Sequence, residues 1–124
     1  MDMNIIPMVK CKNMEESISF YTSILDFEFV GTWPETGSPS FSILKRDGAE
    51  IHLSTHSGDG TFGNVMSIIV GDIDTLFKKY SNRGLNTAHK RESPVNQGPL
   101  DQTWGTREFY VDDPNGNTIR FISR

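Results

Sequence analysis

The sequence predicts an α+β fold in which two βαβββ modules form a curved mixed sheet with helices on its outer face. Three observations support this fold class: short strand-like apolar runs alternate with two amphipathic stretches, this order occurs twice, and the two halves align at constant offsets. A module of about 60 residues is too small to cover its own sheet face. We therefore expect one domain over residues 1–124, with modules at about 1–57 and 62–124.

The first module opens with a strand and a helix. The β-branched run at 5–9 predicts the strand, and the amphipathic stretch at 14–24 predicts the helix. Apolar residues recur in that stretch at spacings of three and four, at Met14, Ile18, Tyr21 and Leu25. Asn13 is the predicted N-cap, because its side chain can accept a hydrogen bond from the first turn of the helix.

Strands and turns complete the first module. Three further strands are predicted at 27–30, 41–44 and 50–53. The segment Gly31–Ser40 holds two prolines and two glycines and is predicted to be a loop. Asp47-Gly48 predicts a tight hairpin turn, because glycine readily adopts a positive φ.

The second module repeats this order. The predicted elements are a strand at 65–70, a helix between Asp72 and Gly84, a weak strand at 85–88, a long loop at 91–102 and a final hairpin at 107–123 around Asp113-Pro-Asn-Gly116. At an offset of 68 residues, Phe41, Ile43 and Ile51 fall on Phe109, Val111 and Ile119. At an offset of 59, Val9, Met14 and Tyr21 fall on Ile68, Ile73 and Tyr80. These alignments indicate an internal duplication.

Composition and charge argue against several classes of protein. The 12 basic side chains are scattered and the formal net charge is −4, so we expect no nucleic-acid partner. No run approaches the ~20 apolar residues that span a bilayer, so we expect no membrane partner. The start of the chain lacks the basic and apolar regions of a signal peptide, which predicts a cytoplasmic location. Cys11 alone can form neither an internal disulfide nor a cysteine-rich zinc site.

Two segments carry a family resemblance. The opening, Pro7-Met-Val-Lys-Cys-Lys-Asn-Met-Glu-Glu-Ser-Ile-Ser-Phe-Tyr21, resembles that of the vicinal oxygen chelate superfamily, which contains glyoxalase I, extradiol dioxygenases and bleomycin resistance proteins. The tail, Gln102-Thr-Trp-Gly-Thr-Arg-Glu-Phe-Tyr-Val-Asp-Asp-Pro-Asn-Gly-Asn-Thr-Ile-Arg-Phe121, resembles the bleomycin resistance branch. The resemblance implies two βαβββ modules per chain and a homodimer whose ligand clefts lie between subunits.

The resemblance also implies where a metal would bind. Enzymes of the superfamily take one ligand from the first strand and one from the last strand of each module, at about Ile6, His52, Val65 and Arg120 in this chain. Only His52 can coordinate a metal, because aliphatic side chains have no donor atom and a guanidinium repels a cation. The resemblance therefore implies a binding protein with no metal, no cofactor and no catalytic residue.

The candidate ligand contacts are Trp33, Phe41, His52, Trp104 and Arg107. The aromatic rings lie in or beside loops, where they can stack on a planar ligand, as rings hold the drug's aromatic tail in bleomycin resistance proteins. Packing against the ends of the core or against a second subunit is the alternative. His52 is expected to be a hydrogen-bonding wall of the cleft. The Arg107-Glu108 pair begins a strand, where Arg107 either contacts the ligand or takes part in a structural salt link or loop anchor.

These observations lead to three hypotheses. The first is a bleomycin resistance-type protein that sequesters a planar cationic small molecule, bleomycin-like or other, without catalysis, and so confers antibiotic resistance. The acidic net charge favours a cationic ligand, because it raises the local concentration of such a molecule. The second is a metal-dependent lyase or dioxygenase that uses His52 with Glu50 or Glu108. The third is a member of the family whose ligand is unrelated to bleomycin.

Overall fold

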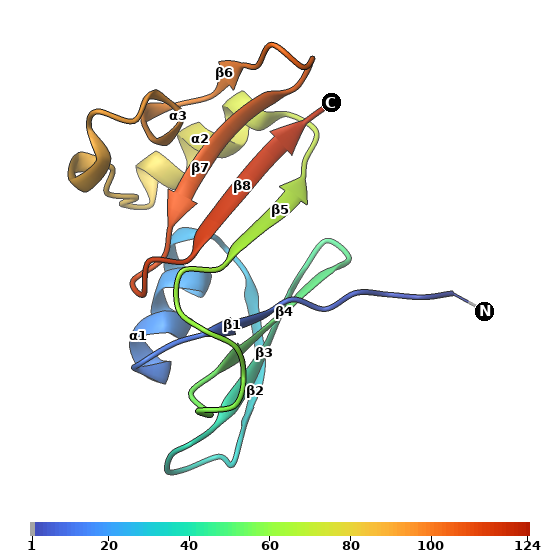
Figure 1. Cartoon of the computed structure of the whole chain (residues 1–124), viewed down its shortest axis with the longest axis vertical. Coiled ribbons are helices and arrows are strands. Elements are labelled where there is room, and N and C mark those ends of the chain that lie inside the picture. Colours follow the sequence, from blue (N-terminus) through green and yellow to red (C-terminus); the bar gives the residue numbers. More distant parts are fainter. Residues whose placement is uncertain (1) are drawn as a thin grey trace. The chain divides into compact units, whose positions relative to one another are not determined.

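The computed structural model describes residues 2–124, which form two compact units. Unit 1 comprises the chain as far as Asn64 together with Pro114–Asn117, and unit 2 comprises Val65–Asp113 and Thr118–Arg124. Each unit contains one βαβββ module (Figure 1). Unit 1 holds β1 (Met8–Lys10), α1 (Met14–Ser19), the π-helix η1 (Phe20–Ile24), β2 (Glu28–Trp33), β3 (Phe41–Arg46) and β4 (Ala49–Ser54). Unit 2 holds β5 (Val65–Ile69), α2 (Ile73–Asn82), the 3₁₀ helix η2 (Ala88–Lys90), α3 (Pro94–Gln97), β6 (Leu100–Asp101), β7 (Arg107–Asp112) and β8 (Thr118–Ser123).

The strands form two four-stranded mixed sheets with the same topology. Their orders are β1-β4-β3-β2 and β5-β8-β7-β6, and in each the first strand runs parallel to the last while the other pairs are antiparallel. The predicted α+β fold of two βαβββ modules is therefore confirmed. The single shared sheet that we expected is instead two sheets, because β1 and β5 are edge strands that each hydrogen-bond to the last strand of their own module.

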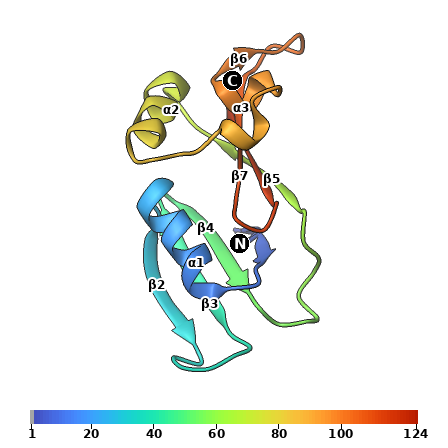
Figure 2. The same ribbon diagram turned by 90° about the vertical axis from the view of Figure 1, so that its left-hand side faces the viewer.

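The helix of unit 1 covers one face of its sheet. Figure 2 shows α1 lying across β3 and β4. Leu44, Ile51 and Leu53 alternate along these strands and are buried beneath the helix, so the residues between them on β4, among them His52, face the other way. The predicted N-cap is confirmed, because Oδ1 of Asn13 accepts the backbone N–H of Glu16 at 2.9 Å.

The hairpin between β3 and β4 has the predicted turn. Asp47 and Gly48 adopt φ values of 47° and 86°, so both residues are in the left-handed region that a two-residue hairpin with the right-handed twist of a sheet requires.

The core of unit 2 is aromatic. The rings of Phe109 on β7 and Phe121 on β8 stack at 4.9 Å, and Tyr80 of α2 packs against both. Asp72 caps α2 as predicted, since its Oδ1 accepts the backbone N–H of Thr75 at 3.1 Å. The helix therefore covers the face of the sheet to which the odd-numbered residues of β7 and β8 point.

Several predicted elements are wrong in extent or type. The expected strand at 85–88 is absent: Oδ1 of Asn86 accepts the N–H of Ala88 at 2.9 Å, and the chain turns into η2. The expected loop at 91–102 contains α3 and the short strand β6. Strand β2 extends past its predicted end, so Trp33 lies on a strand that pairs with β3 rather than in a loop. The helix predicted at 14–24 continues after Ser19 as the π-helix η1.

The final turn of the chain hydrogen-bonds to the end of β1 and to the residues that follow it. Asn117 is fully buried, its Oδ1 accepts the N–H groups of Gly63 and Asn64 at 3.0 Å, and its Nδ2 donates to the carbonyl of Lys10. Asn115 accepts the N–H of Lys12 at 3.0 Å. Within residues 2–124, each helix is too short or too polar to cross a membrane.

Candidate functional site

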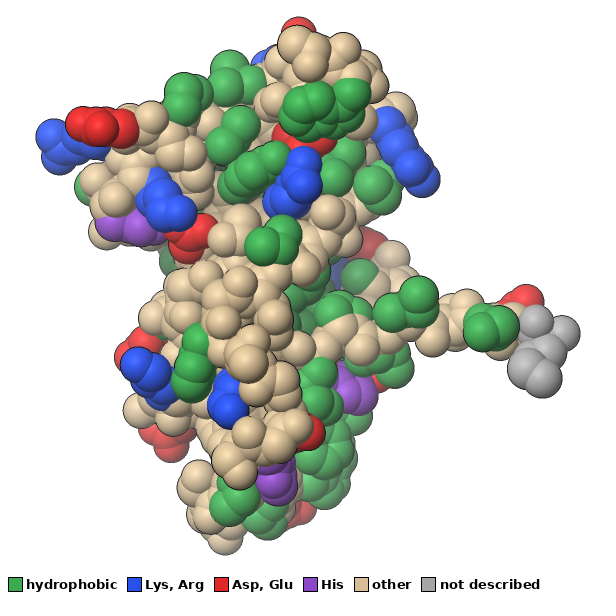
Figure 3. All heavy atoms as spheres, in the orientation of Figure 1, with side chains coloured by type: hydrophobic (Ala, Val, Ile, Leu, Met, Phe, Trp, Pro, Cys, Tyr) green, Lys and Arg blue, Asp and Glu red, His purple; other side chains and the backbone are tan. Residues whose placement is uncertain are grey.

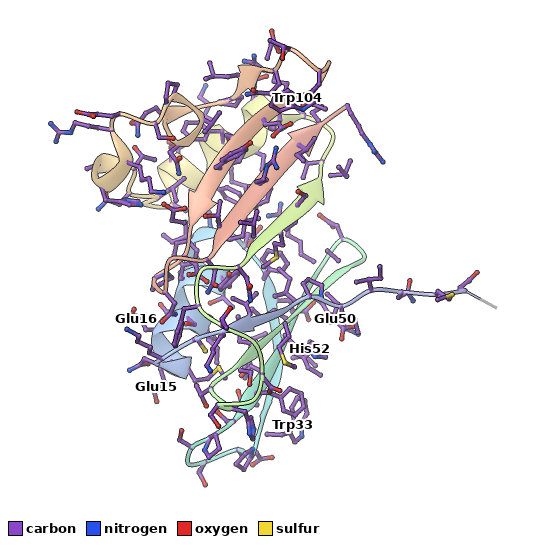
Figure 4. The ribbon with its side chains drawn as sticks, viewed as in Figure 1. Glu15, Glu16, Trp33, Glu50, His52 and Trp104 are labelled. Carbon is purple, nitrogen blue, oxygen red and sulfur yellow. The ribbon has the colours of Figure 1, made fainter. Side chains whose placement is uncertain are left out.

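Three predicted contact residues lie together on the open face of the sheet in unit 1. Trp33 and Phe41 are cross-strand partners whose rings stack at 5.5 Å with an interplanar angle of 29°, and the ring of Phe41 lies 5.9 Å from that of His52. We call these three residues the aromatic strip. Ser42, the neighbour of Phe41 on β3, is buried and donates to the sulfur of Met14 on α1. Because successive side chains of a strand point to opposite faces, Phe41 and the strip face away from α1. Figure 4 shows Glu50, His52 and Trp33 along one side of the unit.

A concavity of about 600 Å³ borders the aromatic strip. Phe41 and His52 form part of its wall, and the connector after β4 supplies His56 and Asp59. Asp59 is held in place because its Oδ2 accepts the hydroxyl of Ser54 at 2.7 Å. The hollow thus combines an aromatic wall with a carboxylate, which are the groups that a flat cation would contact.

His52 is paired with a carboxylate on its own strand. Its Nε2 lies 2.6 Å from Oε2 of Glu50, which also lies 3.7 Å from Nζ of Lys45 through its other oxygen. An ionised carboxylate can only accept, which assigns the ring proton to Nε2, and Nε2 donates a hydrogen bond to Glu50. The predicted role of His52 as a hydrogen-bonding wall stays a prediction.

Unit 2 contains a buried carboxylate that is fully engaged by the protein. Glu108 on β7 is 1% exposed and accepts four side-chain hydrogen bonds. The donors are Nε1 of Trp104 at 3.0 Å, the hydroxyl of Thr106, the hydroxyl of Tyr110 at 3.1 Å and a terminal nitrogen of Arg120 at 2.9 Å. We call these five residues the Glu108 cluster.

The cluster keeps Glu108 ionised. Burial alone would raise the pKa of Glu108, but hydrogen bonds from Thr106, Arg120 and Trp104 outweigh it and hold this pKa below its ordinary value. Burial and the hydrogen bond to Glu108 raise the pKa of Tyr110, and the bond to Glu108 raises that of Arg120. With both oxygens occupied, Glu108 is a structural anion that cannot also bind a metal.

The residues at the superfamily's metal positions do not fit a divalent ion. Of the four positions that the resemblance implies, Ile6 and Val65 have aliphatic side chains without a donor atom, and Arg120 carries a guanidinium that repels a cation. Only His52 has an atom that could coordinate a metal. In residues 2–124 no three His, Cys, Asp or Glu side chains come together as a possible metal site.

The remaining two predicted contacts lie in unit 2, on different faces of its sheet. Trp104, before β7, is 62% exposed and donates to Glu108. Arg107 points toward α2, where its Nε and one terminal nitrogen bind Asp74 at 3.1 and 2.8 Å while the other binds Asp101 at 3.2 Å. The structural salt link expected as the alternative for Arg107 is therefore present, with Asp74 and Asp101 as its partners. A ligand contact by Arg107 stays a prediction.

Sequence reasoning missed the Glu108 cluster. The signal was the period of two along β7, which places Glu108 and Tyr110 on the face opposite the core residues Phe109 and Val111. Their shared partner, Arg120, comes from the next strand and is found only once the register of the hairpin is known.

Comparison with known proteins places the fold. The model of the Glyoxalase/Bleomycin resistance protein/Dioxygenase superfamily matches residues 7–121. A search of curated proteins finds no match. Among solved structures, this chain is similar to a bleomycin-binding protein complexed with bleomycin, with 18% identity, a TM-score of 0.76 and coverage of 99% of each chain.

Two further solved structures have the same fold. A bleomycin resistance determinant encoded on the transposon Tn5 has 18% identity and a TM-score of 0.77, with 99% of this chain and 98% of that chain covered. TnmS3, an antibiotic-binding protein from Streptomyces sp. CB03234, has 18% identity and a TM-score of 0.74, with 99% and 96% covered. Because the family model spans nearly all of the sequence, the chain belongs to the Glyoxalase/Bleomycin resistance protein/Dioxygenase superfamily.

Proposed function

We propose that this chain is a bleomycin resistance-type binding protein that sequesters a planar cationic small molecule in the cytoplasm, without catalysis and without a cofactor. The observation that carries the proposal is the aromatic strip. Trp33, Phe41 and His52 form a continuous row of rings on an uncovered sheet face, beside a hollow large enough for part of a drug-sized molecule.

The strip suits a flat ligand for a physical reason. Trp33 is 44% exposed although it stacks on Phe41, so one of its faces is covered by protein and much of its surface is open to solvent. An offset-stacked ring contributes roughly 0.5–1.5 kcal/mol beyond the burial of its area. A ring that is already held by a neighbour also loses little side-chain entropy when the ligand binds.

Charge favours a cation at this site. Asp59 lines the hollow and Glu50 is paired with His52, while the whole chain carries a formal net charge of −4. The carboxylates attract a cationic ring by their charge, and the faces of the aromatic side chains attract it through their quadrupoles. The solved relatives named as bleomycin-binding and antibiotic-binding proteins support a ligand of this kind.

A homodimer belongs to the same proposal. The first strand of each module, and the segment before β1, expose apolar side chains (Figure 3): Ile5, Ile6, Met8, Val65 and Ile69. Exposed apolar groups on edge strands are commonly covered by a partner. A second copy of this chain is the partner we propose, because the proposed ligand cleft lies between two subunits.

Titration calorimetry of the whole chain with metal-free bleomycin tests the function. We expect saturable binding that weakens in Trp33→Ala and Phe41→Ala. Phe29→Ala is the matched control, because Phe29 is an exposed ring of β2 that pairs with the core residue Leu44 and so lies on the opposite face. Absence of both heat and a thermal shift at ligand concentrations near ~100 μM would contradict bleomycin binding.

A further inference from the structure

A bulge in β2 changes the face to which the second half of this strand points. Phe29 pairs with Leu44 of β3, which is buried beneath α1. Two residues later, Gly31 pairs with Ile43, the neighbour of Leu44 on the open face. Val30 is therefore an extra residue that reverses the alternation of faces along β2. The residues that follow it place the aromatic strip, and not Phe29, on the open face.

The indole of Trp33 lies over the backbone of Gly31. The two residues are two positions apart on β2, so they share the open face. A Cβ on Gly31 would lie 2.7 Å from Cη2, 3.1 Å from Cζ2 and 3.3 Å from Cζ3 of this indole. Carbon atoms that are not bonded to each other normally stay about 3.5–4.0 Å apart. The indole therefore occupies the space that a side chain at position 31 would fill.

Two neighbours on different strands hold the indole of Trp33. The ring of Phe41 on β3 stacks on it at 5.5 Å with an interplanar angle of 29°, and its outer edge lies against Gly31 on β2. The tryptophan nevertheless remains 44% exposed, so much of its surface is open to a ligand. The orientation of this surface depends on the lack of a side chain at position 31.

The backbone at Gly31 does not itself require glycine. Its φ lies outside the left-handed region, unlike that of Gly48. An alanine can adopt such a backbone, and within a strand it loses less conformational freedom on folding than glycine does. The space taken by the indole is thus the feature of the structure that accounts for a glycine here.

We propose that Gly31 is a positioning residue for the aromatic strip, because its missing side chain lets the indole of Trp33 lie over β2 against Phe41, in the orientation that stacks on a planar ligand. The role in binding rests on the proposed function, but the position of the ring can be measured without a ligand. A Cβ at position 31 would displace the indole, since the atoms it meets belong to the far end of a rotatable side chain and not to the backbone.

Fluorescence of the ligand-free protein tests the position of the ring. The chain has two tryptophans, so Trp104→Phe leaves Trp33 as the single emitting indole. In that background Gly31→Ala should shift the emission to longer wavelength and increase its quenching by acrylamide, because the indole loses its contact with the sheet. Gly71→Ala is the matched control, since its φ is also outside the left-handed region and its Cβ would meet no atom within 4 Å. Emission and quenching that Gly31→Ala leaves unchanged would overturn the proposal.

Calorimetry with metal-free bleomycin then tests the effect on binding. Gly31→Ala should weaken binding about tenfold, comparable to the loss of one stacked ring, and Gly71→Ala should not. The same change at Gly31 should have no further effect in Trp33→Ala and little effect in Trp33→Phe, because a phenyl ring does not extend to the outer atoms of the indole. A full tenfold loss in either background would show that Gly31 acts through the backbone and would overturn the proposal.

The two measurements separate this proposal from the proposed function. If the unmodified chain binds no bleomycin, the proposed function fails, and the fluorescence shift decides whether Gly31 positions Trp33. If Gly31→Ala displaces the indole without weakening bleomycin binding, the proposed function stands and the positioning role is rejected. Circular dichroism checks that each variant folds. A Gly31→Ala variant that does not fold would also overturn the proposal, because the backbone would then require the glycine.

Discussion

His52 and Arg120 occupy the same position in the two modules. His52 on β4 pairs with Met8 on the parallel strand β1, and Arg120 on β8 pairs with Ser67 on the parallel strand β5. These pairs differ by 68 residues on the last strands and by 59 on the first strands, the two offsets at which the halves of the sequence align. One module therefore presents an imidazole where the other presents a guanidinium.

The first prediction concerns the strength of the aromatic contacts. Trp33→Ala and Phe41→Ala should each weaken the binding of metal-free bleomycin by about 1–3 kcal/mol, because each loses the buried area and stacking of a ring. Calorimetry gives the affinity, and thermal unfolding separates loss of contact from loss of fold. Unchanged affinity in both folded variants, as expected for the Phe29→Ala control, would reject the aromatic strip as the site.

The second prediction is that the protein retains no catalytic metal. Two aliphatic side chains, Ile6 and Val65, and the guanidinium of Arg120 stand where the resemblance places ligands of the superfamily's enzymes. Elemental analysis after gel filtration should find no stoichiometric zinc, nickel, iron or manganese. The enzyme alternative predicts the reverse, a stoichiometric metal that is lost in His52→Ala and kept in the control His89→Ala.

The third prediction is a homodimer of 14.0 kDa chains. Val65 and Ile69 on β5 are 62% and 51% exposed, and burying them against a second copy would stabilise the assembly. Sedimentation should show a dimer at micromolar concentration, and Val65→Lys with Ile69→Lys should shift it to monomer. Phe29→Lys is the control for adding charge to an exposed apolar position. A monomer in the unmodified chain would remove the intersubunit cleft from the proposal.

The fourth prediction follows from the lowered pKa of Glu108. A carboxyl whose pKa is lower in the folded state stabilises the fold above its unfolded value, about 4.5, and loses that contribution as the pH falls below it. Glu108→Gln should cost about 2–3 kcal/mol at neutral pH, because a buried charge with four donors is replaced by a neutral amide. Denaturant unfolding between pH 3 and pH 7 measures both quantities.

The control for this prediction is Glu28→Gln, at an exposed carboxylate on β2. The variant at Glu108 should also show a flatter decline of stability in acid than the unmodified chain. Part of the decline should remain, because hydrogen bonds also lower the pKa values of Asp72 and Asp74, and those from Lys90 and Thr118 overcome burial to lower that of Asp112. An unchanged acid limb would show that Glu108 is not the group that titrates.

The fifth prediction separates a structural role of Arg107 from the predicted ligand contact. Arg107 joins α2 to β6 through Asp74 and Asp101, so Arg107→Ala should lower the melting temperature. The paired variant Asp74→Asn tests the same link from the other side. If Arg107 also contacts the ligand, affinity should fall in Arg107→Ala but not in Asp74→Asn, whereas equal effects in both would assign it to structure alone.

Local signals in the sequence predicted much of the fold. Asn13 and Asp72 cap the two main helices because their short side chains reach the N–H groups of the first turn, and Asp47-Gly48 forms its turn because both residues adopt positive φ. The duplication was visible because the apolar pattern of a buried strand repeats at the same offset. Each of these features depends on residues close together in the chain or on a simple period.

Other features were decided only by the tertiary structure. The segment 85–88 has only a weak strand pattern, and besides the local contact of Asn86 with Ala88, the side chain of Gln97 donates to the carbonyls of Thr87 and Lys90. The separation of the strands into two sheets likewise depends on tertiary structure, because β1 and β5 each hydrogen-bond only to the last strand of their own module.

The same distinction applies to the candidate sites. The sequence by itself identified Trp33, Phe41, His52 and Trp104 as candidate ligand contacts, because large rings and a histidine in or beside predicted loops can be reached by a ligand. The pairing of Glu108 with Arg120 was decided by the register of β7 and β8, and the placement of Arg107 by its ion pair with α2. Side-chain partners across strands are set by three-dimensional packing, because the period along a strand gives the face on which a residue lies but not its neighbour there.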